Sequence, residues 1–286
     1  MKFPRQTIGM IVLGGIIFLG ISCAKHEPQP IYNGRPLSDW VKDLNYKRPE
    51  EVQNTAKQAI RQIGTNSLPF LANEMITLGK LWEQMGAANF WNSDELMDRT
   101  LGMRNAFKAL GPIAKPAVPE LVHLLNSATN GANTVAAYAL TQIDPQTAVI
   151  ALTQALTNEF IGARLSAANE LYEMRSNADI AVPNLIKCLN DNSPDKEASS
   201  ALRGFSADAL GFIGSDPEKA IPALIEALRQ DKDIRIRITA ARSLAKFGKS
   251  ARSAIPVLMQ ASTNDADSHV RFAATNALKE IKAQFP

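Results

Sequence analysis

The residues best suited to metal chemistry, the histidines, are few in this chain and lie far apart. There are three, His26, His123 and His269, and none has a cysteine or carboxylate at the spacing of a metal ligand set. His26-Glu27 begins like the zinc-protease motif H-E-x-x-H, but Pro30 stands where the second histidine should be. The sequence therefore predicts no metal site.

Motifs for phosphate binding and nucleophilic catalysis are also missing. Gly248-Lys249-Ser250 resembles the end of a P-loop, but Ser243 occupies the place of its first glycine, and no strand is expected before it. Neither G-x-S-x-G nor G-x-G-x-x-G occurs. We therefore predict no cofactor, no catalytic residue and no enzymatic activity.

Cys23 is the residue with the clearest expected modification. Lys2 and Arg5 precede the uncharged segment from Thr7 to Ser22, which is shorter than the roughly 20 residues of a spanning helix. The sequence then reads Leu19-Gly20-Ile21-Ser22-Cys23, which resembles a bacterial lipoprotein signal. The resemblance implies cleavage of a signal peptide, residues 1–22, and acylation of Cys23. An uncleaved anchor or an ordinary secretory signal is the alternative.

Loss of residues 1–22 changes the charge of the chain. The 31 basic residues become 29 without Lys2 and Arg5, against 28 acidic ones, so no polyanionic partner such as nucleic acid is implied. Residues 23–36 are interpreted as a tether. Ala24, which replaces the aspartate that often signals inner-membrane retention in lipoprotein families, favours the outer membrane facing the periplasm, or the cell surface. Cys188 is expected to be a buried free thiol, with a reactive or intermolecularly paired thiol as the alternative.

A period of about 34 residues organises the rest of the chain. It predicts helical hairpins, because proline suits the first turn of a helix and glycine suits its end. No alternating β-branched runs occur, so no sheet is expected. Ser38 is predicted to cap a first helix with Trp40 on its apolar side. The expected second helices open at Pro69, Pro119, Ile150, Pro183, Pro222 and Pro256.

The first helices share a register of their own. Arg164, Arg203, Arg237 and Arg271 each lie seven residues before a leucine, with small residues between. The pairs Asp231/Asp233 and Asp265/Asp267 precede the last two arginines and are predicted to cap their helices and to pair with an arginine of the next layer. Because these residues recur, we interpret them as structural.

This pattern, Asp-x-Asp-x-x-x-Arg, then Ala-Ala, Leu, Gly and Ala-Ile-Pro-x-Leu, resembles the HEAT-like repeats of the phycobilin-lyase type. Residues 32–40 and 109–119 resemble a group of bacterial HEAT-repeat proteins. The resemblance implies an all-α, right-handed α-α solenoid of about six hairpins over residues 37–286, with second helices lining its concave face. Bilin attachment occurs among relatives of this repeat type, so a lyase-like enzyme or enzyme subunit is the alternative function.

Two surfaces are candidates for binding a protein. One is the polar row found four residues into each second helix, for which ordinary solvated positions are the alternative. The other is an insertion near residues 79–103, where Trp82 and Trp91 either pack on lengthened helices or form a hydrophobic knob for a partner. The residues of the polar row are Asn73, His123, Gln154, Lys187, Glu226 and Gln260.

A basic cluster around residues 229–252 completes the candidates. Arg235, Arg242, Lys246 and Lys249 fall on one helix face without interleaved aromatic residues, so a solvated face is favoured over anionic headgroups or an acidic protein. The sequence as a whole predicts a non-catalytic lipoprotein of the bacterial envelope that acts as a scaffold for unknown protein partners.

Overall fold

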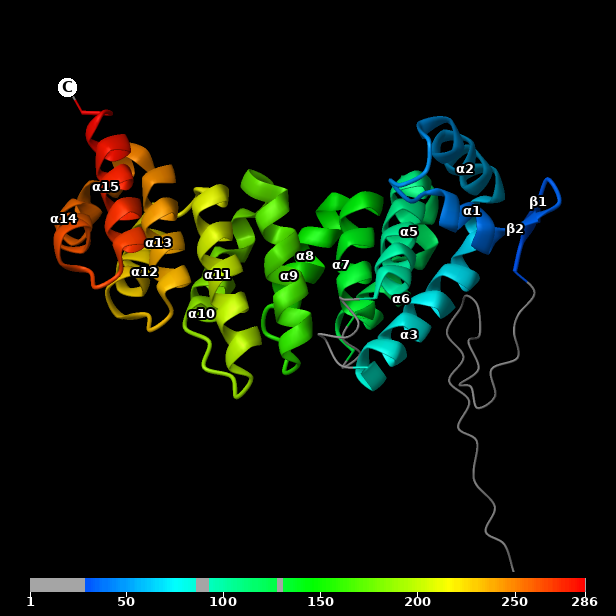
Figure 1. Ribbon diagram of the computed structural model, residues 1–286, viewed down its shortest axis with the longest axis horizontal. Coiled ribbons are helices and arrows are strands. Elements are labelled where there is room, and N and C mark those ends of the chain that lie inside the picture. The colour runs from blue at the N-terminus through cyan, green and yellow to red at the C-terminus, as the bar shows by residue number, and fades with distance from the viewer. Residues whose placement is uncertain (1–28, 86–92, 128–130, 286) are drawn as a thin grey trace, which may run out of the picture.

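The computed structural model describes residues 29–85, 93–127 and 131–285. In these residues helices stack side by side along one axis, from α1 at one end to α15 at the other (Figure 1). The predicted all-α, HEAT-like solenoid is confirmed. The helices are α1 (Leu37–Asp43), α2 (Glu50–Ile63), α3 (Leu68–Met85), α5 (Asp94–Leu110), α6 (Val118–Leu125), α7 (Ala132–Ile143), α8 (Pro145–Ala155), α9 (Ile161–Met174), α10 (Val182–Leu189), α11 (Lys196–Ile213), α12 (Pro217–Gln230), α13 (Ile234–Lys246), α14 (Ile255–Asn264) and α15 (Ser268–Lys282).

Two rows of helices form the stack. The first helices of the hairpins, α5, α7, α9, α11, α13 and α15, each pack against the next one in the series. The second helices are α3, α6, α8, α10, α12 and α14. Four of them carry the predicted proline as their second residue. The prediction was wrong for α8 and α12, which begin at Pro145 and Pro217, five residues before Ile150 and Pro222. One continuous core of Ala, Leu, Ile and Val runs between the rows.

The turns between paired helices depend on residues with positive φ. Gly64, Gly111 and Gly248 adopt φ of 61°, 52° and 55° and lead into short 3₁₀ segments. Arg175 takes the same conformation, φ 55°, although it carries a Cβ. Asp144 instead has φ −151° and caps α8 directly, so that turn is shorter.

Neighbouring first helices approach closely where their side chains are small. A Cβ added to Gly211 of α11 would lie 2.6 Å from the Cβ of Ser243 on α13. The N-terminal helix α1 is packed as closely, since a Cβ added to Gly102 of α5 would lie 2.9 Å from the carbonyl oxygen of Val41 on α1. Larger side chains would push these layers apart.

The N-terminal end differs from the sequence prediction in two details. A small antiparallel ribbon, β1 (Ile31–Tyr32) and β2 (Arg35–Pro36), forms around the turn at Asn33-Gly34 although no sheet was expected. Ser38 does not cap α1; its N–H instead donates to the side chain of Gln29 at 2.8 Å. The last part of the predicted tether is thus docked on α1, where Tyr32 packs edge-on to Trp40.

The insertion near residues 79–103 extends two helices. The second helix α3 continues to Met85, and α5 begins at Asp94 with Ser93 as its N-cap, as its sequence indicates. Residues 86–92, including Trp91, lie outside the described residues, as do residues 1–28 with Cys23.

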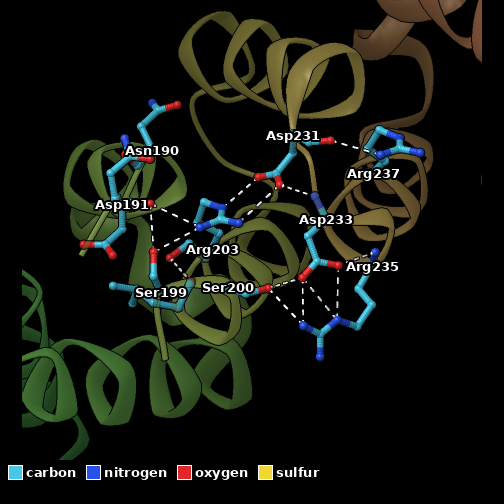
Figure 2. Close-up of polar contacts among 12 residues, drawn as sticks. Asn190, Asp191, Ser199, Ser200, Arg203, Asp231, Asp233, Arg235 and Arg237 are labelled. Atoms are coloured by element: carbon cyan, nitrogen blue, oxygen red, sulfur yellow. Dashed lines mark hydrogen bonds and ion pairs between the residues drawn. The ribbon is translucent and has the colours of Figure 1, made fainter. Parts of the chain in front are cut away.

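Arginine and aspartate side chains link four successive layers. Arg203 binds Asp231 at 2.7 Å (Figure 2). Arg164 likewise binds Asp191 at 3.0 Å, and Arg237 binds Asp265 through two bonds of 2.9 Å. We call these three pairs the Arg–Asp ladder. Each aspartate lies in the loop between the second helix of one layer and the first helix of the next. It pairs with the arginine of the layer that the chain has just left, and not with the arginine of the layer that follows.

Each ladder arginine also holds the loop before its own helix. Nη1 of Arg203 donates to the main-chain oxygen of Asp191, and Nη1 of Arg237 donates to that of Asp231 at 3.0 Å. Asp233 and Asp267 cap α13 and α15 as predicted. The ladder therefore fixes both the loop of its own layer and the position of the next layer.

Replacing one ladder arginine should loosen two layers together. We expect Arg237→Met to lower the free energy of unfolding by about 2–3 kcal/mol, because the largely buried carboxylate of Asp265 loses charge-assisted bonds. The measurement is urea unfolding followed by circular dichroism. Arg242→Met, an exposed arginine on the same helix, is the matched control and should cost less than about 0.5 kcal/mol. Equal losses in the two variants would contradict a special role for the ladder.

Candidate protein-binding surface

The six residues of the polar row all point outward from the second helices. Each is exposed, whereas the leucines two positions earlier on the same helices, such as Leu121, Leu185 and Leu224, are buried. Amphipathic spacing produces this contrast, since residues two apart on a helix lie on different faces. The row is carried by α3, α6, α8, α10, α12 and α14 in the same phase.

Hydrogen bonds join several of the second helices side by side. The Asn184 amide on α10 donates to the carbonyl oxygen of Thr153 on α8 at 3.0 Å. The Asn158 amide after α8 donates to the side chain of Asn126 after α6, also at 3.0 Å. Contacts between α10 and α12 and between α12 and α14 continue the series. The polar row therefore runs across adjacent layers as one surface, which we call the second-helix face.

The second-helix face combines apolar and polar groups. One position before the row residues, Val122, Ile186 and Ile225 are half-buried, and Met259 is exposed. Four positions before them stand exposed prolines and, on α8, exposed Ile150. With one lysine and one glutamate in the row itself, this face suits a protein surface better than a polyanion.

Of the two tryptophans in the candidate site, the structure describes Trp82 but not Trp91. Trp82 is half-buried, packs against the core, and lies 3.4 Å from where a Cβ of Gly131 would be, at the start of α7. Gly131, with φ 90°, lets that helix begin against the indole. Trp91 lies outside the described residues, so the two are not placed relative to each other.

Much of the predicted basic cluster is occupied by contacts within the chain. Arg235 forms an ion pair with Asp233 at 2.7 Å and holds the pKa of that carboxyl well below its usual range. The Lys246 ammonium lies 3.7 Å from the centre of the Phe212 ring. Arg242 and Lys249 are exposed. Such pairing favours the interpretation as a solvated face.

The groups able to do acid, base or metal chemistry stay apart in the described part of the chain. His123 and His269 are both exposed on separate helices, and His269 lies 3.4 Å from Asp267. No cluster of three or more His, Cys, Asp or Glu side chains in residues 29–85, 93–127 and 131–285 could hold a metal ion. Cys188 is a buried free thiol, as predicted, and burial raises its pKa to about 11.

One buried acid was missed by the sequence analysis. Glu170 on α9 is only 3% exposed and lies 3.6 Å from the guanidinium of Arg104, which in turn stacks on Tyr138. Burial raises the pKa of Glu170 to about 7, against the lowering effect of Arg104. The alignment of the repeats indicated that this position is buried, because the residues that correspond to Glu170 in later layers, Ala209 and Ser243 among them, are small.

The stability of the protein should depend on the protonation of Glu170. Its pKa in the folded state, about 7, exceeds its usual value of 4.5, so the associated stability is complete below pH 4.5 and is lost as pH rises through 7. We expect Glu170→Gln to remove that loss, which amounts to at most about 3 kcal/mol at pH 8. Urea unfolding at pH 5, 6.5 and 8 measures it.

The exposed Glu120 of α6 provides the control for this prediction, because it does not contribute to the raised pKa of Glu170. Glu120→Gln makes the same charge change and should leave the pH profile of the wild type unchanged. Parallel pH profiles for wild type and Glu170→Gln would refute the prediction.

Comparison with known proteins agrees with the repeat architecture. Residues 195–279, which span α11 to α15, match the family model of HEAT repeats. No curated protein matches the chain. None of the helices in the described residues is long and apolar enough to cross a membrane.

Solved karyopherin structures show the same fold at low sequence identity. The karyopherin Kap121p, bound to the extreme C-terminus of the protein phosphatase Cdc14p, is similar over 87% of this chain, with 13% identity and a TM-score of 0.58. Its complex with Nup53p gives the same values. The chain spans 30% of the karyopherin's length. An engineered protein, 22% identical with a TM-score of 0.49, is covered over 98% of its length by 86% of this chain.

Proposed function

We propose that this chain is a non-catalytic scaffold that binds other proteins through its second-helix face while lipidated Cys23 holds it at the bacterial envelope. The observation that carries the proposal is the run of six exposed positions in identical phase on six successive second helices. A stack with such a face offers a partner an extended surface. The HEAT-type fold supports this role, since the solved karyopherin neighbours are complexes with protein ligands.

The proposed mode of binding is many shallow contacts spread over several layers. Exposed prolines and the half-buried apolar side chains next to the row provide apolar contact area for a partner. The row residues themselves provide hydrogen-bonding groups and single charges. Two surface hollows, of about 280 and 270 Å³, lie elsewhere, between α13 and α15 and between α1 and α2. A protein ligand lying along the face needs no deep pocket.

Charge reversal on the second-helix face should weaken partner binding without unfolding the chain. We expect Lys187→Glu combined with Glu226→Lys to reduce recovery of crosslinked partners from envelope membranes about tenfold, because like charges then face each other. The matched control is Lys196→Glu with Glu197→Lys, two exposed residues of first helix α11 with the same net change. Trp82→Ala tests the knob hypothesis in the same assay.

Two results would count against the second-helix face. Equal recovery from the row variant and the wild type would remove it as the binding site, and equal losses in the row variant and its control would show a general charge effect. Loss of partners in Trp82→Ala alone would move the site to the insertion.

The lipid anchor has a separate test. A cleaved signal peptide and a diacylated Cys23 would together hold the chain stably, whereas a single acyl chain binds a bilayer only marginally. We expect mass spectrometry of the membrane-extracted protein to find Cys23 as the modified first residue. Cys23→Ser should release the chain from the membrane fraction. An unmodified chain that still begins at Met1 would refute lipidation and the proposed placement at the outer membrane or cell surface.

A further inference from the structure

Arg175 holds a backbone conformation that glycine adopts in comparable turns of this chain. Its φ and ψ are 55° and −134°, close to the 61° and −138° of Gly64 and the 52° and −133° of Gly111. This region of φ and ψ is sparsely populated except by glycine, because a Cβ is strained there. The arginine therefore destabilises the turn that it occupies.

The guanidinium of Arg175 lies over the ring of Phe212 together with a second cation. Its central carbon is 4.6 Å from the ring centre, and the ammonium nitrogen of Lys246 is 3.7 Å from the same centre. Tyr172 packs edge-on to this ring, with 5.0 Å between the ring centres. The C-terminal ends of three successive first helices, α9, α11 and α13, thus bring two positive charges to one aromatic side chain.

Neither cation has an acidic partner among the residues that the structure describes. The ion pairs of the chain engage other basic residues, and the half-buried Asp208 of α11 takes part in none of them. Two like charges near one ring repel each other, and an exposed cation–π contact stabilises by no more than such backbone strain costs. Stability alone therefore does not account for Arg175.

The surface next to Lys246 is hollowed. A cavity of about 280 Å³ lies between α13 and α15, and its lining includes Arg242, Lys246, Phe272 and Glu280. Arg242 is exposed and, in the described part of the chain, forms no ion pair either. This hollow offers room for a side chain of a partner directly beside the cations.

We propose that the surface around Phe212 binds an acidic segment of a partner protein. Carboxylates of the segment pair with the Arg175 guanidinium and the Lys246 ammonium, and a neighbouring side chain enters the hollow beside Arg242. We call this surface, which consists of Arg175, Phe212, Lys246 and Arg242, the cation–aromatic surface. It belongs to the first helices, so the inference goes beyond the second-helix face of the proposed function.

The charges around these cations favour a protein segment over an extended polyanion or an anionic membrane. Asp208 stands one turn before Phe212, Glu173 lies two residues before Arg175, and Glu280 lines the hollow. These acids repel a partner that brings many negative charges at once, whereas a protein segment can place a few carboxylates at the cations alone. The predicted basic cluster, which lacks Arg175, is as a whole still a solvated face.

Site-specific photocrosslinking in the native cells identifies the partner segment. The full chain carries p-benzoylphenylalanine in place of the exposed Glu173, and the crosslinked peptide is sequenced by mass spectrometry. We expect an adduct with a different protein, at or next to a run of aspartate and glutamate. Arg175→Gln should reduce the adduct at least tenfold, because it removes a charge-assisted pair.

Arg252→Gln is the matched control for the photocrosslinking. Arg252 is another exposed arginine, and its guanidinium carbon lies 5.3 Å from the centre of the Phe285 ring. Because it lies outside the cation–aromatic surface, its replacement should leave the adduct yield unchanged. A loss equal to that of Arg175→Gln would show a general effect of charge and would contradict the proposal.

Arg175→Gly separates binding from stability. It should reduce the adduct as much as Arg175→Gln does, yet raise the thermal unfolding temperature by roughly 2 °C, because glycine relieves the strained backbone. Arg175→Gln keeps the strain and should not raise that temperature. An arginine with only a structural role would give the reverse result, a lower unfolding temperature for Arg175→Gly and an unchanged adduct.

Binding of purified components then decides the class of partner. A synthetic peptide with the sequence of the crosslinked segment should bind the purified chain. Arg175→Gln and the exchange of the peptide's acids for amides should each weaken the dissociation constant about tenfold, with little further loss when combined. Vesicles that contain anionic phospholipid should bind the wild type and Arg175→Gln equally.

Four results would each overturn the proposal. They are the absence of any adduct with another protein, an adduct yield independent of Arg175, a crosslinked segment without acidic residues, and binding to the anionic vesicles that depends on Arg175. The last result would assign the surface to a membrane instead of a protein.

Discussion

The close approach of neighbouring first helices is the constraint on which the rest of this structure depends. Gly211 and Ser243 show how little room there is, because a single added methyl group on the glycine would overlap its neighbour. Each layer buries its own apolar side chains only when the next layer lies at this distance. The phase of the second helices, and hence the alignment of the polar row, follows from that distance.

The ladder pairs act at the same spacing by a different force. Dispersion and the hydrophobic effect favour any close approach, whereas the two-bond geometry between Arg237 and Asp265 favours one register between layers. The burial of both partners makes a shifted register costly, because it would leave a charge without its counterion. The register between layers is therefore fixed by a few Arg–Asp pairs, although most of the buried contacts are made by alanines and leucines.

Much of the architecture could be predicted from the sequence, because the same residue pattern recurs in several helical hairpins. Prolines that open second helices and glycines with positive φ mark local backbone geometry, which depends on nearby residues alone. The positive φ of Arg175 was less accessible, since packing around one turn overrides the preference of its residue type. The ribbon around Asn33-Gly34 was missed because two residues per strand leave no alternating pattern to detect.

The candidate site was predictable only in part. Exposure of the polar row follows from helix periodicity, and the repeat register offered a signal for the burial of Glu170. Its neighbours Arg104 and Tyr138 became apparent only when the fold brought α5, α7 and α9 together.

The burial of Cys188 has a consequence for the compartments in which this chain can fold. A thiol with its pKa raised to about 11 is almost wholly protonated at neutral pH, and the thiolate is the form that enters disulfide exchange. No covalent crosslink holds the described layers together, and the Cys188 sulfur instead packs at 3.3 Å from the carbonyl oxygen of Leu156. The folded solenoid is therefore expected to be indifferent to redox potential, equally stable among reducing thiols and in an oxidising medium.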